Sequence, residues 1–223
     1  MRVNTNSFWL IFFVISAAAE LGAIIFGLTP VHLVAKPLLM ITLLLYFIFA
    51  TKGYPAWRTL VGIALVCSWA GDVFLMVGNR FVEGLSAFLL AHLFYISAYH
   101  KTGASNGQLK PQDMLKFVLF GIVLIWMLYP GLDDMLIPVV AYALILLSMG
   151  VWAHKRRGAT STTSFRLVAA GAVLFVVSDG LLALNRFAIE IPAERILVMS
   201  TYIAAQFMIV QGLIKHEKPG YSV

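Results

Sequence analysis

Several ionisable and polar side chains of this sequence lie inside long apolar stretches, where such residues are unusual. They are Glu20, Lys36, Asp72, His92, Asp179, Tyr202 and Gln206. A charge at the middle of a membrane helix costs at least about 2.5 to 3.5 kcal/mol, so these residues usually face a polar interior and mark a functional site. Two carboxyl groups, such as those of Asp72 and Asp179, can divide acid and base roles between them in a hydrolysis.

The composition indicates that the solvent around these side chains is lipid. The chain of 223 residues is 61% hydrophobic and 12% charged, with a mean hydropathy of +0.91, which leaves too little polar surface to cover a water-soluble domain. Its single cysteine, Cys67, excludes an internal disulfide. The net charge of +6 comes from basic residues in short loops rather than on an amphipathic face, which argues against nucleic acid as a partner.

Eight apolar runs predict an all-α integral membrane protein with eight transmembrane helices in a single polytopic membrane domain, residues 1–223. Each run has roughly the 20 residues that a helix needs to cross a bilayer core. The predicted spans are 8–27, 31–50, 57–77, 84–100, 114–129, 135–152, 165–184 and 195–214. The first run follows Arg2 and contains Ala17-Ala18-Ala19, as a secretory signal would, but it continues to Phe26 and is therefore interpreted as a span.

The basic residues are distributed unequally between the two sides of this predicted topology. Twelve fall on the side of the two termini: Arg2, Lys52, Arg58, Lys101, Lys110, Lys116, Lys155, Arg156, Arg157, Arg166, Lys215 and Lys218. The other side and its helix ends hold four: Lys36, Arg80, Arg186 and Arg195. The positive-inside rule therefore predicts that both termini are cytoplasmic, in the plasma (inner) membrane if the source is bacterial.

The polar residues inside the spans are predicted to lie at one depth. Counted from the extracytoplasmic end of each span at 1.5 Å per residue, six of them fall about 8 to 12 Å below that surface. They are Glu20, Lys36, Asp72, His92, Asp179 and Tyr202. We therefore predict a water-filled pocket in the outer half of the bilayer. Other interpretations stay open: an interhelical ion pair between Glu20 and Lys36, a packing role for His92, and an interfacial position for Tyr202.

The segments that contain the two aspartates resemble each other. DVFLMVGNRF begins at Asp72 and DGLLALNRF begins at Asp179, so both share an aspartate, a leucine three residues later, and Asn-Arg-Phe. This echo favours two parallel four-helix halves, which would set the aspartates facing each other across the pocket. Arg80 and Arg186 would flank the pocket mouth, where a guanidinium can bind a lipid phosphate, although both are also typical helix-end charges.

At this point the motifs resemble the YhhN family of membrane proteins, whose characterised members are lysoplasmalogenases. The matching pieces are KPLLM from Lys36, SWAGDVFLM around Asp72, AFLLAHLFY with His92 and Tyr95, SDGLLALNRF around Asp179, and TYIAAQ with Tyr202 and Gln206. The resemblance implies hydrolysis of the vinyl ether bond of a lysoplasmalogen to a fatty aldehyde and glycerophosphoethanolamine or glycerophosphocholine. It also implies that activity depends on Asp72 and Asp179. Glu20 has no place in the family pattern.

Vinyl ether hydrolysis needs an acid for the outer alkene carbon, a negative charge for the oxocarbenium-like cation, and a water. One aspartate, Asp72 or Asp179, would be the acid, and the other would stabilise the cation and orient the water. Lys36 is the candidate cation that keeps one carboxylate ionised. The candidate substrate-binding or positioning residues are Lys36, His92, Tyr95, Tyr202, Gln206, Glu20, Arg80 and Arg186. The expected partners are a lysophospholipid substrate and membrane lipids, without a cofactor or metal.

Two alternatives from other classes remain at this stage. A proton-coupled carrier of lipids or small solutes could use the same aspartates as a proton relay. A metal-dependent membrane hydrolase could use Asp72, His92 and Asp179, but zinc sites usually recruit more nitrogen or sulfur ligands than one histidine supplies.

Overall fold

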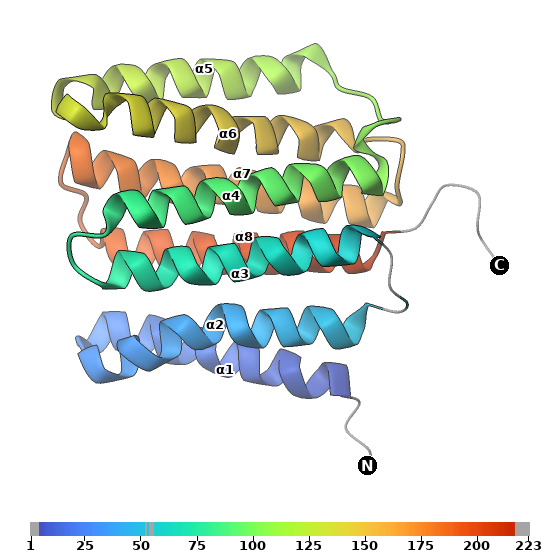
Figure 1. The fold of residues 1–223 in the computed structure, drawn as a ribbon, viewed down its shortest axis with the longest axis horizontal. Coiled ribbons are helices and arrows are strands. Elements are labelled where there is room, and N and C mark those ends of the chain that lie inside the picture. Colours follow the sequence, from blue (N-terminus) through green and yellow to red (C-terminus); the bar gives the residue numbers. More distant parts are fainter. Residues whose placement is uncertain (1–4, 52, 54–55, 217–223) are drawn as a thin grey trace. The chain divides into compact units, whose positions relative to one another are not determined.

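The computed structural model describes residues 5–51, 53 and 56–216, and its long elements there are all helices. They are α1 (Thr5–Phe26), α2 (Thr29–Ala50), α3 (Ala56–Met76), α4 (Phe81–Tyr99), α5 (Pro111–Leu128), α6 (Leu136–Lys155), α7 (Thr162–Phe187) and α8 (Glu194–Ile214) (Figure 1). Eight helices of this described part are long and apolar enough to cross a membrane. The prediction of an all-α integral membrane protein with eight spans is confirmed. Three of the twelve basic residues used for the orientation, Arg2, Lys52 and Lys218, lie outside the described residues.

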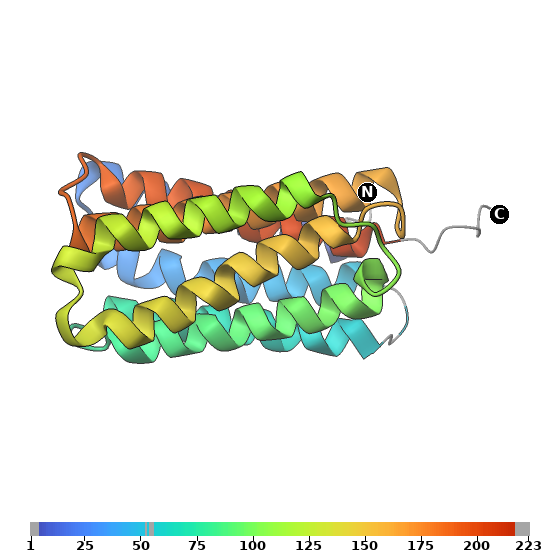
Figure 2. The ribbon, with the colours of Figure 1, turned by 90° about the horizontal axis from the view of Figure 1, so that it is seen from above.

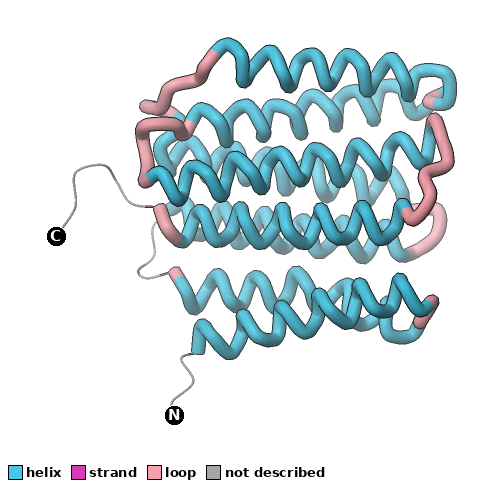
Figure 3. The backbone as a smooth tube through the Cα atoms, turned by 180° about the vertical axis from the view of Figure 1, so that it is seen from behind, coloured by secondary structure: helices cyan, strands magenta, loops and turns pink. Residues whose placement is uncertain are grey.

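The helices begin and end within a few residues of the predicted spans, and most differences arise at caps. Pro111 occupies the first position of α5, where its missing N–H costs nothing. Ser161 caps α7 by accepting a hydrogen bond from the Ser164 N–H at 3.3 Å, so this helix starts three residues before the predicted boundary. Hydropathy does not register such polar start signals. The loops and turns of the described part of the chain are drawn in pink in Figure 3.

The chain divides into two compact units, residues 1–95 and 96–223, with the boundary inside α4. In the first unit, α1 and α2 form a hairpin and lie side by side, and α2 packs against α3 (Figure 1). Helices α3 and α4 meet at Gly71, where an added Cβ would lie 2.6 Å from the Phe88 ring. The single membrane domain and the two parallel halves stay predictions.

In the second unit, α5 and α6 lie side by side and are joined by two short 3-10 turns, Tyr129–Gly131 and Asp133–Met135 (Figures 1 and 2). Helices α7 and α8 pack most closely. A Cβ added at Gly171 would lie 2.8 Å from the Ala205 carbonyl oxygen, and one at Gly212 would lie 2.9 Å from the Val168 nitrogen. Small residues that let two backbones approach are typical of helix pairs in membranes.

The two echo segments adopt different structures in their second halves. Helix α3 ends at Met76. The segment after Asp72 is one residue longer than the segment after Asp179, and its Gly78 is followed by Asn79 in the left-handed region, with a φ of 64°. Helix α7 instead continues to Phe187, so Arg186 lies in its last helical turn. Arg80 lies in the turn before α4, where its exposed guanidinium is 3.9 Å from Glu83. The two similar segments therefore have the same helical structure for the first turn after each aspartate, and their structures differ beyond it.

Candidate active site

The observed helix ends place the polar residues over a wider range of depths than predicted. Counted at 1.5 Å per residue, Asp72 lies about 6 Å from the end of α3, and Asp179 about 12 Å from the end of α7. Glu20 and Lys36 lie between these values, about 9 and 10 Å from the corresponding ends of α1 and α2. His92 is deepest, about 16 Å from the start of α4, because that helix begins three residues before the predicted span.

Asp179 is held by a hydroxyl group from the neighbouring helix. The phenolic O–H of Tyr142 in α6 donates a short hydrogen bond to Oδ2 of Asp179 in α7. Tyr142 is buried and Asp179 is half-buried. The preceding residue, Ser178, donates from its hydroxyl to the carbonyl of Val198 in α8 at 3.0 Å. These bonds fix α7 against α6 and α8 at the level of the carboxylate, and Tyr142 is a further candidate site residue that no motif of the sequence indicates.

Two further candidate residues, Tyr202 and Gln206, belong to α8. Tyr202 contacts α7 at Phe175, one helical turn before Asp179. Tyr202 in α8 packs edge-on against Phe175, with ring centroids 5.5 Å apart and an interplanar angle of 89°. Gln206 donates from Nε2 to the Tyr202 hydroxyl at 3.4 Å, and both side chains are buried. Tyr202 of α8 therefore contacts α7 one turn before Asp179, and Gln206 is bonded to it.

Asp72 lies on the buried face of α3 in the first unit, with an exposure of 3%. Ser68 and Leu65, which lie one and two turns earlier on the same face, are fully buried. Ser68 and Asp72 thus form a polar strip inside an otherwise apolar face. On α4, His92 and Tyr95 are fully buried as well. That Asp72 and Asp179 share one pocket stays a prediction.

Glu20 is paired with a histidine that no motif of the sequence indicates. Its carboxylate is fully buried, and its two oxygens lie 2.8 and 3.1 Å from Nδ1 of His32 in α2. The alternative of an ion pair between Glu20 and Lys36 is wrong, because the rotation of α2 turns His32 rather than Lys36 toward the carboxylate. Lys36 is half-buried one turn further along α2, and within the described residues it has neither a hydrogen bond nor an ion pair.

We expect His32→Ala to destabilise the protein by about 1 to 3 kcal/mol, because it leaves the buried carboxyl of Glu20 without a partner. Thermal unfolding in detergent measures this loss. The double variant Glu20→Leu with His32→Leu should lose less than the sum of the two single leucine variants, since it removes both polar groups together. Additive losses would contradict a coupled pair.

A second set of charged residues lies at the opposite ends of the helices. Arg156, counted above as a loop charge, is fully buried and donates to the Thr102 carbonyl at 3.1 Å and to the Ser164 hydroxyl at 2.9 Å. Burial lowers the pKa of Arg156 to about 10, so it remains charged at neutral pH. Its neighbour Arg157 is 2.6 Å from the buried carboxylate of Asp113. This cluster ties together helix ends of the second unit and lies away from Asp179.

The fold and the buried polar groups define the class of the protein: a multispanning membrane protein with carboxyl, hydroxyl and imidazole groups inside its helices. The chain belongs to the YhhN family, whose pattern matches residues 31–213. Helix α1, which carries Glu20, precedes the matched region. This agrees with the absence of Glu20 from the family motifs.

Curated relatives cover most of the chain. It is 34% identical to the mouse protein "Lysoplasmalogenase TMEM86B" over 81% of this chain and 74% of the relative. The human protein of the same name is 35% identical over 82% of this chain and 74% of its own. A "Lysoplasmalogenase" from Mycobacterium bovis is 31% identical over 67% of this chain and 58% of its own. No solved structure matches the chain.

Proposed function

We propose that this protein is a lysoplasmalogenase, which uses water to cleave the vinyl ether bond of a lysoplasmalogen. The products are a fatty aldehyde and glycerophosphoethanolamine or glycerophosphocholine. The observation that carries the proposal is the oriented carboxylate of Asp179, held by Tyr142 inside a spanning helix of a protein whose relatives are named as this enzyme. Those names favour hydrolysis over the alternative of a carrier.

The hydrogen bond of Tyr142 supports a division of roles between the aspartates. A hydroxyl hydrogen bond stabilises a carboxylate, so we assign Asp179 the part of the anion. The buried carboxyl of Asp72 then delivers a proton to the outer alkene carbon, which makes the carbon bonded to oxygen an oxocarbenium-like cation. Asp179 stabilises that cation and orients the water. Water adds to the cation and passes a proton to Asp179. When the hemiacetal breaks down, that proton goes to the departing glycerol oxygen and the proton of the hemiacetal hydroxyl returns to Asp72, so the aldehyde and the glycerol hydroxyl form and both aspartates regain their starting states.

Lys36 is the candidate for binding the phosphate of the substrate. It is half-buried in α2 and without an anionic partner in the described part of the chain. An ammonium group in that position is stabilised by a phosphate more than by lipid tails. Glu20 is already bound to His32, so it serves this site by fixing the start of α2 rather than by contacting substrate.

The direct test is turnover by the purified protein in lipid nanodiscs. A 1-alkenyl lysophospholipid should yield aldehyde, whereas the matched 1-alkyl lipid, which lacks the double bond, should not react. In D2O the product should carry one deuterium on the carbon next to the aldehyde, because the reaction protonates that carbon. Transport of unchanged lipid without aldehyde release would overturn the proposal in favour of a carrier.

Tyr142→Phe is expected to lower kcat by about 10 to 100 times, because Asp179 loses the group that orients it while the carboxylate remains. KM should stay within about twofold, since Tyr142 is not proposed to bind substrate. Tyr99→Phe is the matched control, because Tyr99 is a buried tyrosine near the Arg156 cluster. Equal activity of the two variants in the aldehyde assay would remove Tyr142 from the site.

We also propose a topology, from the distribution of the basic residues. Both termini are cytoplasmic, and the polar residues lie in the outer half of the bilayer, in the plasma membrane if the source is bacterial. Supporting this orientation, Arg156 and Arg157 follow the end of α6 and Lys110 precedes α5, so basic residues gather at one end of the second unit.

A further inference from the structure

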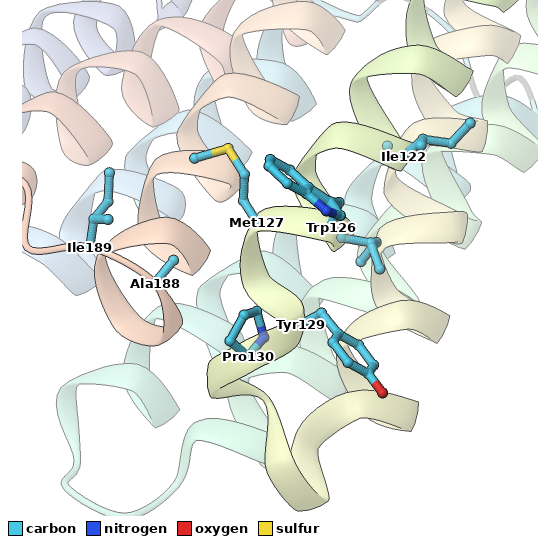
Figure 4. Close-up of a pocket in the computed structure, with 9 residues that line it drawn as sticks. Ile122, Trp126, Met127, Tyr129, Pro130, Ala188 and Ile189 are labelled. Atoms are coloured by element: carbon cyan, nitrogen blue, oxygen red, sulfur yellow. The ribbon is translucent and has the colours of Figure 1, made fainter.

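An apolar groove of about 850 Å³ lies on the second unit, where α5 ends and the segment after α7 begins. Its lining residues are Gly121, Ile122, Ile125, Trp126, Met127, Tyr129, Pro130, Ala188 and Ile189. Figure 4 shows the side chains of Trp126 and Met127 from α5 and those of Ala188 and Ile189 from the segment that follows α7. The volume falls in the range of small-molecule binding sites, roughly 300 to 1,000 Å³.

Backbone contacts hold both walls of the groove in place. At Gly131 an added Cβ would overlap the Phe187 carbonyl oxygen, so the turn after α5 packs directly on the end of α7. On the other wall, the N–H groups of Ala188 and Ile189 both donate to the Leu184 carbonyl at 2.9 Å. The Asn185 side chain accepts from the Ile191 N–H at 2.9 Å and fixes the following residues. The groove is therefore preformed, which lowers the entropic cost of binding.

The chemistry of the groove suits a hydrocarbon chain with a polar end. Its side chains are apolar, including the thioether of Met127, apart from the indole N–H of Trp126 and the Tyr129 hydroxyl. Trp126 and Tyr129 are 76% and 64% exposed, as expected for aromatic residues at a membrane–water interface. Arg186 lies in the last turn of α7, two residues before Ala188, and brings positive charge to the same end. An apolar groove with polar aromatic groups at its edge complements the alkyl chain of a lipid.

The groove is also adjacent to the helix that carries Asp179. An added Cβ at Gly180 would lie 3.2 Å from the Phe120 ring, so α5 and α7 touch at the residue after the aspartate. The next residue of α5, Gly121, lines the groove. The groove therefore borders the contact between α5 and α7 at the residue that follows Asp179.

We infer that this groove binds the alkenyl chain of the lysophospholipid substrate and is the lateral entry from the outer leaflet toward Asp179. The inference rests on the proposed function for the identity of the lipid. The groove, rather than the aspartates, then sets the preference for chain length, because it is the apolar surface that a longer chain covers.

Photo-crosslinking tests the occupant directly. The probe is a 1-O-alkyl lysophosphoethanolamine with sixteen carbons and a terminal diazirine, which the enzyme cannot cleave, in nanodiscs of diacyl phosphatidylcholine. We expect labelling within residues 121–130 and at Ile189 that an unlabelled lysolipid abolishes. Labelling that the lysolipid does not displace would identify ordinary surrounding lipid and overturn the inference, as would labelling elsewhere.

Filling the groove provides the functional test. Ala188→Trp should raise KM for a sixteen-carbon substrate about tenfold, equivalent to about 1.4 kcal/mol of binding, and leave an eight-carbon substrate within about twofold. Val123→Trp is the matched control, since Val123 is exposed on α5 but does not line the groove. If Ala188→Trp does not fold, Ile189→Ala serves instead, with an expected rise of about threefold for the long chain only. Equal effects on both chain lengths would contradict the inference.

The outcomes separate this inference from the proposed function. Labelling in the groove that lysolipid displaces, without aldehyde release, would support lysolipid binding in the groove and contradict vinyl ether hydrolysis. Aldehyde release in which Ala188→Trp does not change the dependence of KM on chain length would support vinyl ether hydrolysis and contradict binding of the chain in the groove. If Ala188→Trp instead converts a dimer to a monomer in nanodiscs, the groove is an interface between two copies and the inference falls.

Discussion

Asp72→Asn and Asp179→Asn are each expected to lower the rate of aldehyde release by at least about a hundredfold, because asparagine can neither deliver the proton nor carry the negative charge. Both substitutions keep the size of the side chain, and the amide oxygen introduced by Asp179→Asn would still accept the hydrogen bond of Tyr142. Lysolipid binding should therefore change little. Initial rates at saturating 1-alkenyl lysophospholipid in detergent measure the effect.

Asp113→Asn is the matched control for both substitutions. Asp113 is another buried aspartate with a polar partner, Arg157, but it lies in the first turn of α5 at the other end of the helices. Its loss should cost stability and leave the rate per folded molecule within about twofold. If all three variants lose activity equally, buried aspartates support only the fold, and the acid–base mechanism is excluded.

Gly171→Ala is expected to destabilise the protein by about 1 to 3 kcal/mol, although it adds a single methyl group. That methyl would meet backbone atoms of α8, 2.8 Å from the Ala205 oxygen and 2.9 Å from the Ile209 nitrogen. Backbone cannot rotate away as a side chain does, so α7 and α8 must separate. The separation would also displace Asp179 relative to Tyr202 and reduce turnover. Thermal unfolding in detergent and the aldehyde assay measure the two effects.

Gly22→Ala provides the comparison for this prediction. An added Cβ at Gly22 in α1 has no atom within 4 Å, so the substitution places a methyl group in open space on another membrane-spanning helix. Its unfolding temperature should equal that of the unchanged protein or exceed it slightly. If Gly22→Ala and Gly171→Ala behave alike, the close approach of α7 and α8 does not limit stability.

The spans could be predicted from the sequence because lipid imposes a length and a composition on every helix that crosses it. The runs around Asp72 and Asp179 were recognisable for the same reason, since a carboxyl group is conspicuous in an apolar stretch. The motifs around these residues also indicated the family, which the match over residues 31–213 confirms. These signals are local, and the sequence alone carries them.

The partners of the charged groups could not be predicted in this way. Glu20 binds His32 and not Lys36, Asp179 binds Tyr142, and Arg156 is buried although it lies in a run of three basic residues. Each pairing depends on the rotation of one helix about its axis relative to the next. That rotation is set by where small residues such as Gly171 let two backbones meet, and hydropathy is almost insensitive to it.

The sequence by itself thus determined the number of helices, their boundaries to within a few residues, and which residues could carry chemistry. Only the tertiary structure decided which of those residues form hydrogen bonds or ion pairs and with which partners. It also decided where an apolar groove lies between α5 and the end of α7. The physical reason is that membrane insertion depends on the composition of each segment separately. Side-chain pairing depends on the packing of segments that are far apart in the chain.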